Sequence, residues 1–331
     1  MSMQYEFLEN VCDILDSQRI PVTAVDRKAG PYPYYGANGV QDYVADYIFD
    51  DELVLLAEDG GNFGSKDKPI AYRVSGKCWV NNHAHVLKPK NCIDIDYFCY
   101  SIKFYDTSRL VNGATRQKLT QAAMRKMLIP MREIEIQRGI AVKIGRIEYL
   151  IQKRKDQLNR IDDLVKSQFI EMFGNPITNS QNRPTKLFID VVKLQRGYDL
   201  PVQDRVEGVV PVYGSNGILS YHNDSRAEDG IITGRSGTIG KVYFCRGEFW
   251  PLNTTLYSVD KHGNNPVFLT ALLQFFDLSR FYNGTGVPTL NRNIVHKERI
   301  IDIPRKEQDR FAAFVEQTDK SKIPYEMEVA V

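Results

Sequence analysis

Hydrophobic and polar positions along the chain predict two strand-rich regions. Apolar runs at 53–56 and 71–74 are typical of buried strands, with glycine and proline between them. Residues 5–16 have the apolar spacing of a short helix, and residues 96–110 also have a helical pattern. This mixture predicts a compact α/β (α+β) module in the first part of the chain.

The same layout returns in the second half. Strands are expected at 230–233 and 241–244, followed by a helix at 266–281. The segment 33–39, which contains Tyr-Gly-x-Asn-Gly, returns at 211–217, a shift of 178 positions, and later matched pairs are shifted by 171. Because the order never changes and the period far exceeds the roughly 20–50 residues of solenoids, the pattern indicates a tandem domain duplication.

A long helical segment separates the two regions. It begins near Glu133, and Gly174 followed by Pro176 marks its end. About 36 helical residues would extend about 54 Å. Such a helix is unstable alone, so its apolar seam predicts a partner helix or subunit. The seam residues, the candidates for a subunit interface, are Ile144, Ile147, Ile151, Leu158, Ile161, Val165 and Met172.

A second helical opening at 307–315 resembles the first. Lys322 and Pro324 interrupt it after roughly four turns. The sequence therefore predicts that the second spacer helix is shorter than the first.

Composition limits the class of protein. The chain has 331 residues, of which 43% are hydrophobic and 25% charged, as in soluble globular proteins. It contains no apolar run of about 18 residues, and its start lacks a cationic region followed by an apolar core, so we expect a cytoplasmic protein. Net charge is only +2, so a nucleic-acid binder of this composition must concentrate positive charge locally.

Cysteine and histidine usage gives little support for a metal site. Five cysteines without a C-x-x-C pair predict reduced thiols. Cys78, His83, His85, Cys92 and Cys99 offer zinc-ligand types, but their spacings fit no common zinc pattern and the second copy lacks their counterparts. We therefore expect no bound metal.

Candidate DNA contacts lie in the polar loops of both copies. The glycine-rich loop 234–241 fails the spacing of a nucleotide-binding P-loop, yet its donors suit phosphates or groove edges. A tight turn between two strands explains the same residues, and a type I′ hairpin turn explains Asn38 and Asn216. The candidates are Asn38, Asn62, Ser65, Lys66, Asn82, Arg116, Gln117 and Lys118 in the first copy, and Asn216, Arg235, Ser236, Thr238, Lys241, Asn253, Thr285 and Arg292 in the second.

Catalytic motifs are absent from the sequence. Segment 174–177 is a helix terminator and lacks the Asn-Pro-Pro-Tyr-like tetrad of an amino-methyltransferase. There is also no H-E-x-x-H, no Ser/His/Asp arrangement and no nuclease-type carboxylate–lysine set. A duplicated chain of this kind is more often a binding protein than an enzyme.

Several of these motifs occur together in one known family. They are the Tyr-Gly-x-Asn-Gly turns at 35–39 and 213–217, the loop 233–240, segment 286–291, the spacer entries 134–137 and 304–308, and the domain entry 187–198. Over about residues 5–322, the combination resembles the DNA-specificity subunit of type I restriction–modification systems.

This resemblance implies a non-catalytic subunit whose two target-recognition domains each read one half of a bipartite site in double-stranded DNA. The spacer would dock methyltransferase subunits and, through them, the restriction subunit. S-adenosylmethionine, ATP and Mg would be bound by those partners and none by this chain. The implied parts are recognition domain 1 (1–132), spacer helix (133–174), recognition domain 2 (175–304), and a shortened second spacer with tail (305–331).

The shortened second spacer departs from the family pattern, so another chain would complete the seam, which makes self-association a further expectation. Two other interpretations stay open. One is a truncated or degenerate interaction protein, and the other is a stand-alone restriction–modification enzyme with catalytic residues that no motif reveals.

Overall fold

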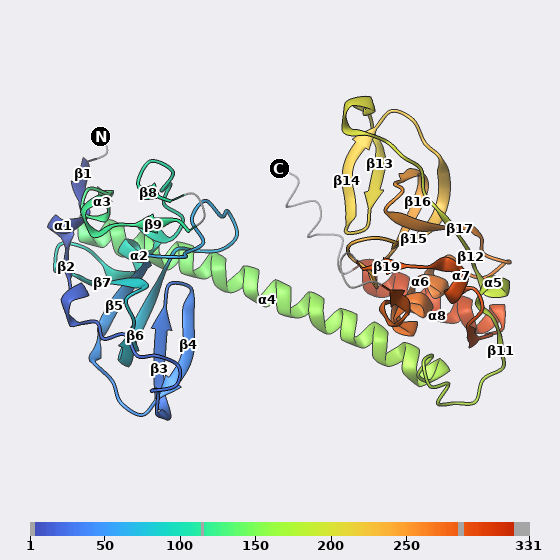
Figure 1. Cartoon of the computed structure of the whole chain (residues 1–331), viewed down its shortest axis with the longest axis horizontal. Coiled ribbons are helices and arrows are strands. Elements are labelled where there is room, and N and C mark those ends of the chain that lie inside the picture. The colour runs from blue at the N-terminus through green and yellow to red at the C-terminus, as the bar shows by residue number, and fades with distance from the viewer. Residues whose placement is uncertain (1–3, 114–115, 284–287, 321–331) are drawn as a thin grey trace. The chain divides into compact units, whose positions relative to one another are not determined.

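The computed structural model describes residues 4–113, 116–283 and 288–320 (Figure 1). The chain divides into two compact units, Met1–Gln152 (unit 1) and Lys153–Val331 (unit 2). None of the described helices is both long enough and apolar enough to cross a membrane. The finer division into four parts stays a prediction.

Unit 1 is built on a six-stranded sheet in the order β2-β7-β5-β6-β3-β4 (Figure 1). Neighbours are antiparallel except for β3 and β6, which are parallel. The strands are β2 Cys12–Ile14, β3 Ala29–Gly36, β4 Gly39–Val44, β5 Phe49–Ala57, β6 Ala71–Val80 and β7 Ala84–Pro89.

Unit 2 repeats this sheet in the order β12-β17-β15-β16-β13-β14, again with one parallel pair, β13 and β16. Its strands are β12 Lys193–Arg196, β13 Val210–Gly214, β14 Gly217–His222, β15 Ala227–Gly234, β16 Val242–Pro251 and β17 Thr255–Asp260. The predicted class, two similar α/β (α+β) domains and a long helix, is confirmed.

Smaller elements complete each unit. The two-stranded sheets pair β1 Gln4–Phe7 with β10 Leu128–Met131, β8 Val111–Asn112 with β9 Lys118–Leu119, β11 Thr185–Leu187 with β20 Arg299–Ile301, and β18 Tyr282–Asn283 with β19 Thr289–Leu290. The helices other than α4 are α1 Leu8–Val11, α2 Ile95–Lys103, α3 Gln121–Met124, α5 Phe188–Val191, α6 Pro266–Phe276, α7 Arg292–Val295 and α8 Arg305–Lys320, with 3-10 turns η1 Asp16–Gln18, η2 Val202–Asp204 and η3 Leu278–Phe281.

The long helix α4, Ile134–Phe173, belongs to unit 1 at its start and to unit 2 at its end. At its start Ala141 joins the unit 1 core, and Lys103 forms an ion pair with Glu148 at 2.5 Å. At its end Phe169 and Phe173 are fully buried among the aromatic rings of unit 2. Each end of the helix is therefore held by a different hydrophobic core.

The helix ends as the sequence predicts, because Gly174 has a φ of +78°, which glycine adopts without strain. Seam residues Ile147 and Ile151 are 56% and 47% exposed, whereas Val165 and Met172 pack against the unit 2 core. The predicted interruption near Lys322 lies outside the described residues.

Three local predictions were wrong. Residues 5–16 form β1, α1 and β2 in place of one helix, because pairing with β10 and β7 outweighs local periodicity. The helix predicted for 96–110 ends at Lys103. The one predicted for 266–281 ends at Phe276, where Asp277 adopts a left-handed φ of 57° and η3 follows.

The Asn-Gly turns are hairpins, as predicted, but they are not type I′ turns. A type I′ turn needs positive φ at both central residues, and neither Asn38 nor Asn216 has it. Gly39 and Gly217, which follow the turns, have φ of +107° and +110°, values that glycine adopts without strain. The register shifts of the two hairpins lie two residues further on, where Gln41 and Leu219 are the extra residues.

Candidate nucleic-acid interface

One end of the unit 1 sheet gathers the loops that carry many of the candidates. The Asn38 side chain donates to the Gly60 carbonyl at 3.0 Å, and the Gly60 amide donates to Gln117 O at 3.2 Å. The amide of Glu58 donates to His83 O at 2.9 Å. Four segments that are distant in sequence thus meet at one end of the sheet.

These loops line a cleft of about 490 Å³. It brings together Asn38, Asn82 and Arg116 among the predicted contacts, and Gln41 and Asn81 add further amide groups to its wall. The cleft is therefore rich in carboxamides, which can donate and accept hydrogen bonds at once.

Arg116 is the cleft's exposed cation. Its Nε lies 2.5 Å from Asp59, and its side chain is 61% exposed. Its Nη2 also lies 3.4 Å from the Nδ1 of His83. The carboxylate fixes one edge of the guanidinium and leaves the rest toward solvent.

Five other unit 1 candidates lie outside the lining of this cleft. Asn62 donates to Pro69 O, and Ser65 Oγ accepts from the amide of Lys68 at 3.0 Å, so both side chains shape the loop after β5. Lys66 and Gln117 are exposed. Lys118, also outside that lining, forms an ion pair with Glu58 at 3.1 Å.

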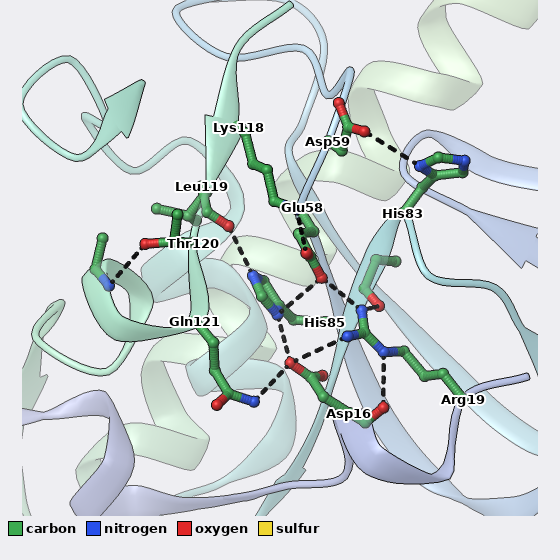
Figure 2. Close-up of polar contacts among 12 residues, drawn as sticks. Asp16, Arg19, Glu58, Asp59, His83, His85, Lys118, Leu119, Thr120 and Gln121 are labelled. Atoms are coloured by element: carbon green, nitrogen blue, oxygen red, sulfur yellow. Dashed lines mark hydrogen bonds and ion pairs between the residues drawn. The ribbon is translucent and has the colours of Figure 1, made fainter. Parts of the chain in front are cut away.

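Beside the cleft, unit 1 contains a buried charged network that sequence reasoning missed (Figure 2). His85 is fully buried; its Nδ1 lies 2.6 Å from Asp16 and its Nε2 lies 2.9 Å from Leu119 O (Figure 2). Both ring nitrogens therefore face oxygen atoms of other residues, an arrangement in which a doubly protonated ring can donate to both.

Asp16 is held as a carboxylate in this network. Burial alone raises its pKa, but the hydrogen bond and charge of His85, the Val86 amide and Arg19 hold that pKa below its ordinary value. Gln121 donates a further hydrogen bond at 3.0 Å. The carboxylate is thus satisfied from several sides.

Glu58 completes the network. Burial raises its pKa, but Arg19 at 2.7 Å, the charge of His85 and Lys118 together lower it below its ordinary value. Asp16, Glu58 and His85 offer metal-ligand atoms within 4.8 Å of one another. However, the Arg19 guanidinium already pairs with both carboxylates, so a cation would have to displace it. The expectation of no bound metal stays a prediction.

The backbone of unit 2 reproduces this site. In unit 1 the amide of Glu58 donates to His83 O, and its carbonyl accepts from the amide of Leu119. In unit 2 the amide of Arg235 donates to Thr254 O, and its carbonyl accepts from the amide of Leu290. Glu58 and Arg235 are therefore equivalent positions.

Three more equivalences follow from strand register and helix starts. Leu56 and Thr233 each lie two residues before the equivalent positions Glu58 and Arg235. Leu56 pairs with His85 and Thr233 pairs with Leu256, so His85 and Leu256 are equivalent. Arg196 pairs with Leu256, and Asp16 contacts His85, the residue equivalent to Leu256. Arg196 and Asp16 are therefore equivalent. Gln121 and Arg292 both begin a short helix capped by the preceding side chain. The equivalent pairs are Asp16 and Arg196, Glu58 and Arg235, His85 and Leu256, and Gln121 and Arg292.

In unit 2 this position is an open cavity of about 310 Å³. Arg235 Nη1 donates to Asn253 O at 3.3 Å, and Arg196 lies 3.8 Å from Asp199. The Arg292 carbonyl accepts from the His296 amide at 2.8 Å, but its guanidinium has no hydrogen-bond or ion-pair partner among the described residues. The lining residues are Arg196, Arg235, Leu256, Thr289, Leu290, Asn291, Arg292 and Asn293.

The cavity brings together two predicted contacts, Arg235 and Arg292, and adds Arg196, which sequence reasoning missed. Arg196 lies within the predicted domain entry at 187–198, but no repeated motif marks it, because its unit 1 counterpart is Asp16. The place of Arg196 in this site can therefore be recognised only from the strand pairing in the structure.

The remaining unit 2 candidates lie around the glycine-rich loop. Lys241 donates to Asn216 at 2.6 Å, which ties the loop to the β13–β14 hairpin tip. Asn253 donates to Asp199, and Ser236 bridges to the strand residue Thr289. Thr285 lies outside the described residues.

The loop itself is a tight turn. A Cβ atom at Gly234 would lie 1.7 Å from the carbonyl oxygen of Thr238, so only glycine fits there. Thr238 is half-buried beside it. This supports the turn interpretation for the glycines and leaves the role of the polar side chains a prediction.

The fold thus defines a tandem of two equivalent α/β units joined by a helix. Residues 2–161 match the family model of the type I restriction modification DNA specificity domain. The N-terminal part of the chain therefore belongs to that family, and the resemblance inferred from the sequence is confirmed.

Individual relatives agree with this assignment. A Haemophilus influenzae protein described as a type I restriction enzyme specificity subunit is 35% identical over 142 residues, which cover 43% of this chain and 36% of that protein. The match therefore spans about a third of the relative's length. The crystal structure of a type I restriction–modification S subunit from M. genitalium covers 100% of this chain and 92% of its own, with a TM-score of 0.67 at 12% identity. At that identity it supports the fold of both units.

Proposed function

We propose that this chain is the non-catalytic, sequence-specific DNA-binding subunit of a type I restriction–modification complex, in which each unit reads one half of a bipartite site. The main support is the equivalence of the two units at the level of strand register, together with the family match over residues 2–161. Two copies of one recognition fold suit a target with two separate parts.

In unit 1 the cleft supplies the chemistry for base recognition. The amides of Asn38, Gln41 and Asn82 can pair with the donor and acceptor edges of bases in the major groove. Arg116, fixed by Asp59, can contact a phosphate or an acceptor edge. In unit 2 the arginine-lined cavity lies at the position of the buried network of Asp16, Glu58 and His85.

Helix α4 offers a surface for partner subunits. Ile147, Leu150 and Ile151, which share one face of the helix, are each at least 47% exposed, an unusual cluster of apolar side chains for a solvated helix. We propose that methyltransferase subunits cover this face, and that the restriction subunit associates through them. S-adenosylmethionine, ATP and Mg would be bound by those subunits and not by this chain.

Selection from a randomised duplex library tests the proposal. The full chain, mixed with its methyltransferase partner, is expected to enrich two specified segments separated by a gap of unspecified bases. Replacing residues 187–304 by another recognition domain should change one segment only.

Two results would redirect the proposal. Methyl transfer or cleavage by the purified chain alone would favour an enzyme. Partner binding without any enriched motif would favour a degenerate interaction protein.

A further inference from the structure

The equivalent sites of the two units carry opposite charge. Unit 1 has Asp16 and Glu58 where unit 2 has Arg196 and Arg235. The carboxylates of unit 1 are neutralised from within the unit by His85, Arg19 and Lys118. In unit 2 both acidic residues are replaced by arginines, so the site lacks this internal compensation of charge.

Arginines dominate the charge around the unit 2 cavity. Of its eight lining residues, three are arginines and none is acidic. The carboxylate of Asp199 lies 3.8 Å from Arg196, but both side chains are at least half exposed, so this pair is weak. Three guanidinium groups around one cavity repel one another unless an anion enters.

Other features of the cavity suit an anion with several oxygens. Asn291 and Asn293 add side-chain amides beside Arg292, and each can donate to an oxygen. Nearby, burial and then the positive charges of Arg292 and Lys193 lower the pKa of His296, which is consistent with a positive local field.

A phosphate fits this chemistry better than a base edge. The acceptor edge of guanine is neutral and pairs with one arginine, which would leave two guanidinium groups uncompensated. A phosphate carries a full negative charge, and its oxygens accept from several donors at once.

We propose that Arg196, Arg235 and Arg292 bind one phosphate of the DNA backbone, and that this anchors unit 2 in register on its half-site. The equivalent site in unit 1 is closed by Asp16 and Glu58 and binds no phosphate. This inference rests on the proposed DNA-binding function and adds an asymmetry between the two units.

The test compares Arg292→Gln with wild type in the full chain. Arg292 is chosen because its guanidinium has no hydrogen-bond or ion-pair partner among the described residues, so loss of this charge should leave the fold intact. Arg310→Gln is the matched control, since it removes the same charge from an exposed position on α8 that does not line the cavity. The dissociation constant is measured across a salt series on the enriched duplex and on duplexes altered at single positions.

For Arg292→Gln we expect binding about tenfold weaker on every duplex and a salt slope smaller by about 1, as for a lost phosphate contact. A loss confined to one altered base pair would overturn the proposal in favour of base reading. Unchanged binding, or an equal loss in Arg310→Gln, would also overturn it. Failure of the wild-type chain to bind any duplex would refute the proposed function itself, a result distinct from all of these.

Discussion

The two units use one backbone for two chemistries. The hydrogen bonds from Leu119 to Glu58 and from Leu290 to Arg235 have the same length, 2.8 Å, although the side chains at these positions have opposite charge. The strand ladders are made by main-chain hydrogen bonds, so side chains at equivalent positions can differ while the pairing stays the same. The comparison shows that two copies of one fold can keep the same backbone around a site while the side chains that line it change from acidic to basic.

The charged residues of the two sites also differ in whether they serve the stability of the fold or the binding of a ligand. In unit 1 the charged groups are buried and satisfy one another, so removing one leaves an uncompensated charge. In unit 2 the arginines border an open cavity, and the side chain of Arg196 is 50% exposed. The same position therefore supports the fold in unit 1, whereas in unit 2 we propose that it binds a phosphate.

The largest expected effect is on the stability of unit 1. His85→Leu copies the residue found at the equivalent position in unit 2, but it leaves Asp16 without its buried cationic partner. We expect the free energy of unfolding to fall by about 3–5 kcal/mol, measured by urea denaturation of the full chain.

The control is Arg196→Gln, at the position equivalent to Asp16. Because the Arg196 side chain is 50% exposed, we expect a change within about 0.5 kcal/mol. Equal losses in the two variants would show that the sites do not differ in the way described.

A smaller contrast is expected in the dependence of stability on pH. The folded-state pKa values of Asp16 and Glu58 lie below their ordinary values of 3.8 and 4.5, so their contribution is present at neutral pH and lost as the pH falls below about 4.5. His296, which accepts from the Leu194 amide at 3.1 Å, has a pKa lowered from 6.5. It must therefore be neutral when folded.

Unit 2 should accordingly begin to lose stability as the pH falls below about 6.5, before unit 1 does. Thermal unfolding followed from pH 7.5 to 3.5 by probes placed in each unit checks the order. Simultaneous loss in both units, or loss in unit 1 first, would contradict it.

The smallest expected effect concerns the hairpin tips. Asn38 donates to Gly60 O in unit 1, whereas Asn216 accepts from Lys241 in unit 2. Asn38→Ala and Asn216→Ala should each reduce the free energy of unfolding by about 1 kcal/mol. Asn216→Ala should also free Lys241, which a proton-exchange measurement of its ammonium group would detect as faster exchange.

Much of the fold could be predicted from the sequence. The repeated Tyr-Gly-x-Asn-Gly segments, the falling shift and the helix ending at Gly174 together indicated two like domains and a spacer. The segment 5–16 was misassigned because its periodicity suits a helix, while its partners, β7 and β10, lie more than 70 residues away in the chain.

The candidate site was harder to predict. Asp16, Glu58 and His85 are scattered through the first unit, and only strand pairing brings them together. Comparison of the repeats did not help, because their counterparts are two arginines and a leucine. Arg235 and Arg292 were found from their loops, whereas Arg196 needed the register of β12 and β17.

The most direct test of the central claim, two units that contact DNA separately and by different chemistry, is ethylation interference on the enriched duplex. We predict interference in two separated stretches, with one phosphate in the unit 2 half losing its effect in Arg292→Gln and every unit 1 phosphate unchanged. A single continuous stretch, or an identical pattern in the wild type and the variant, would contradict the account.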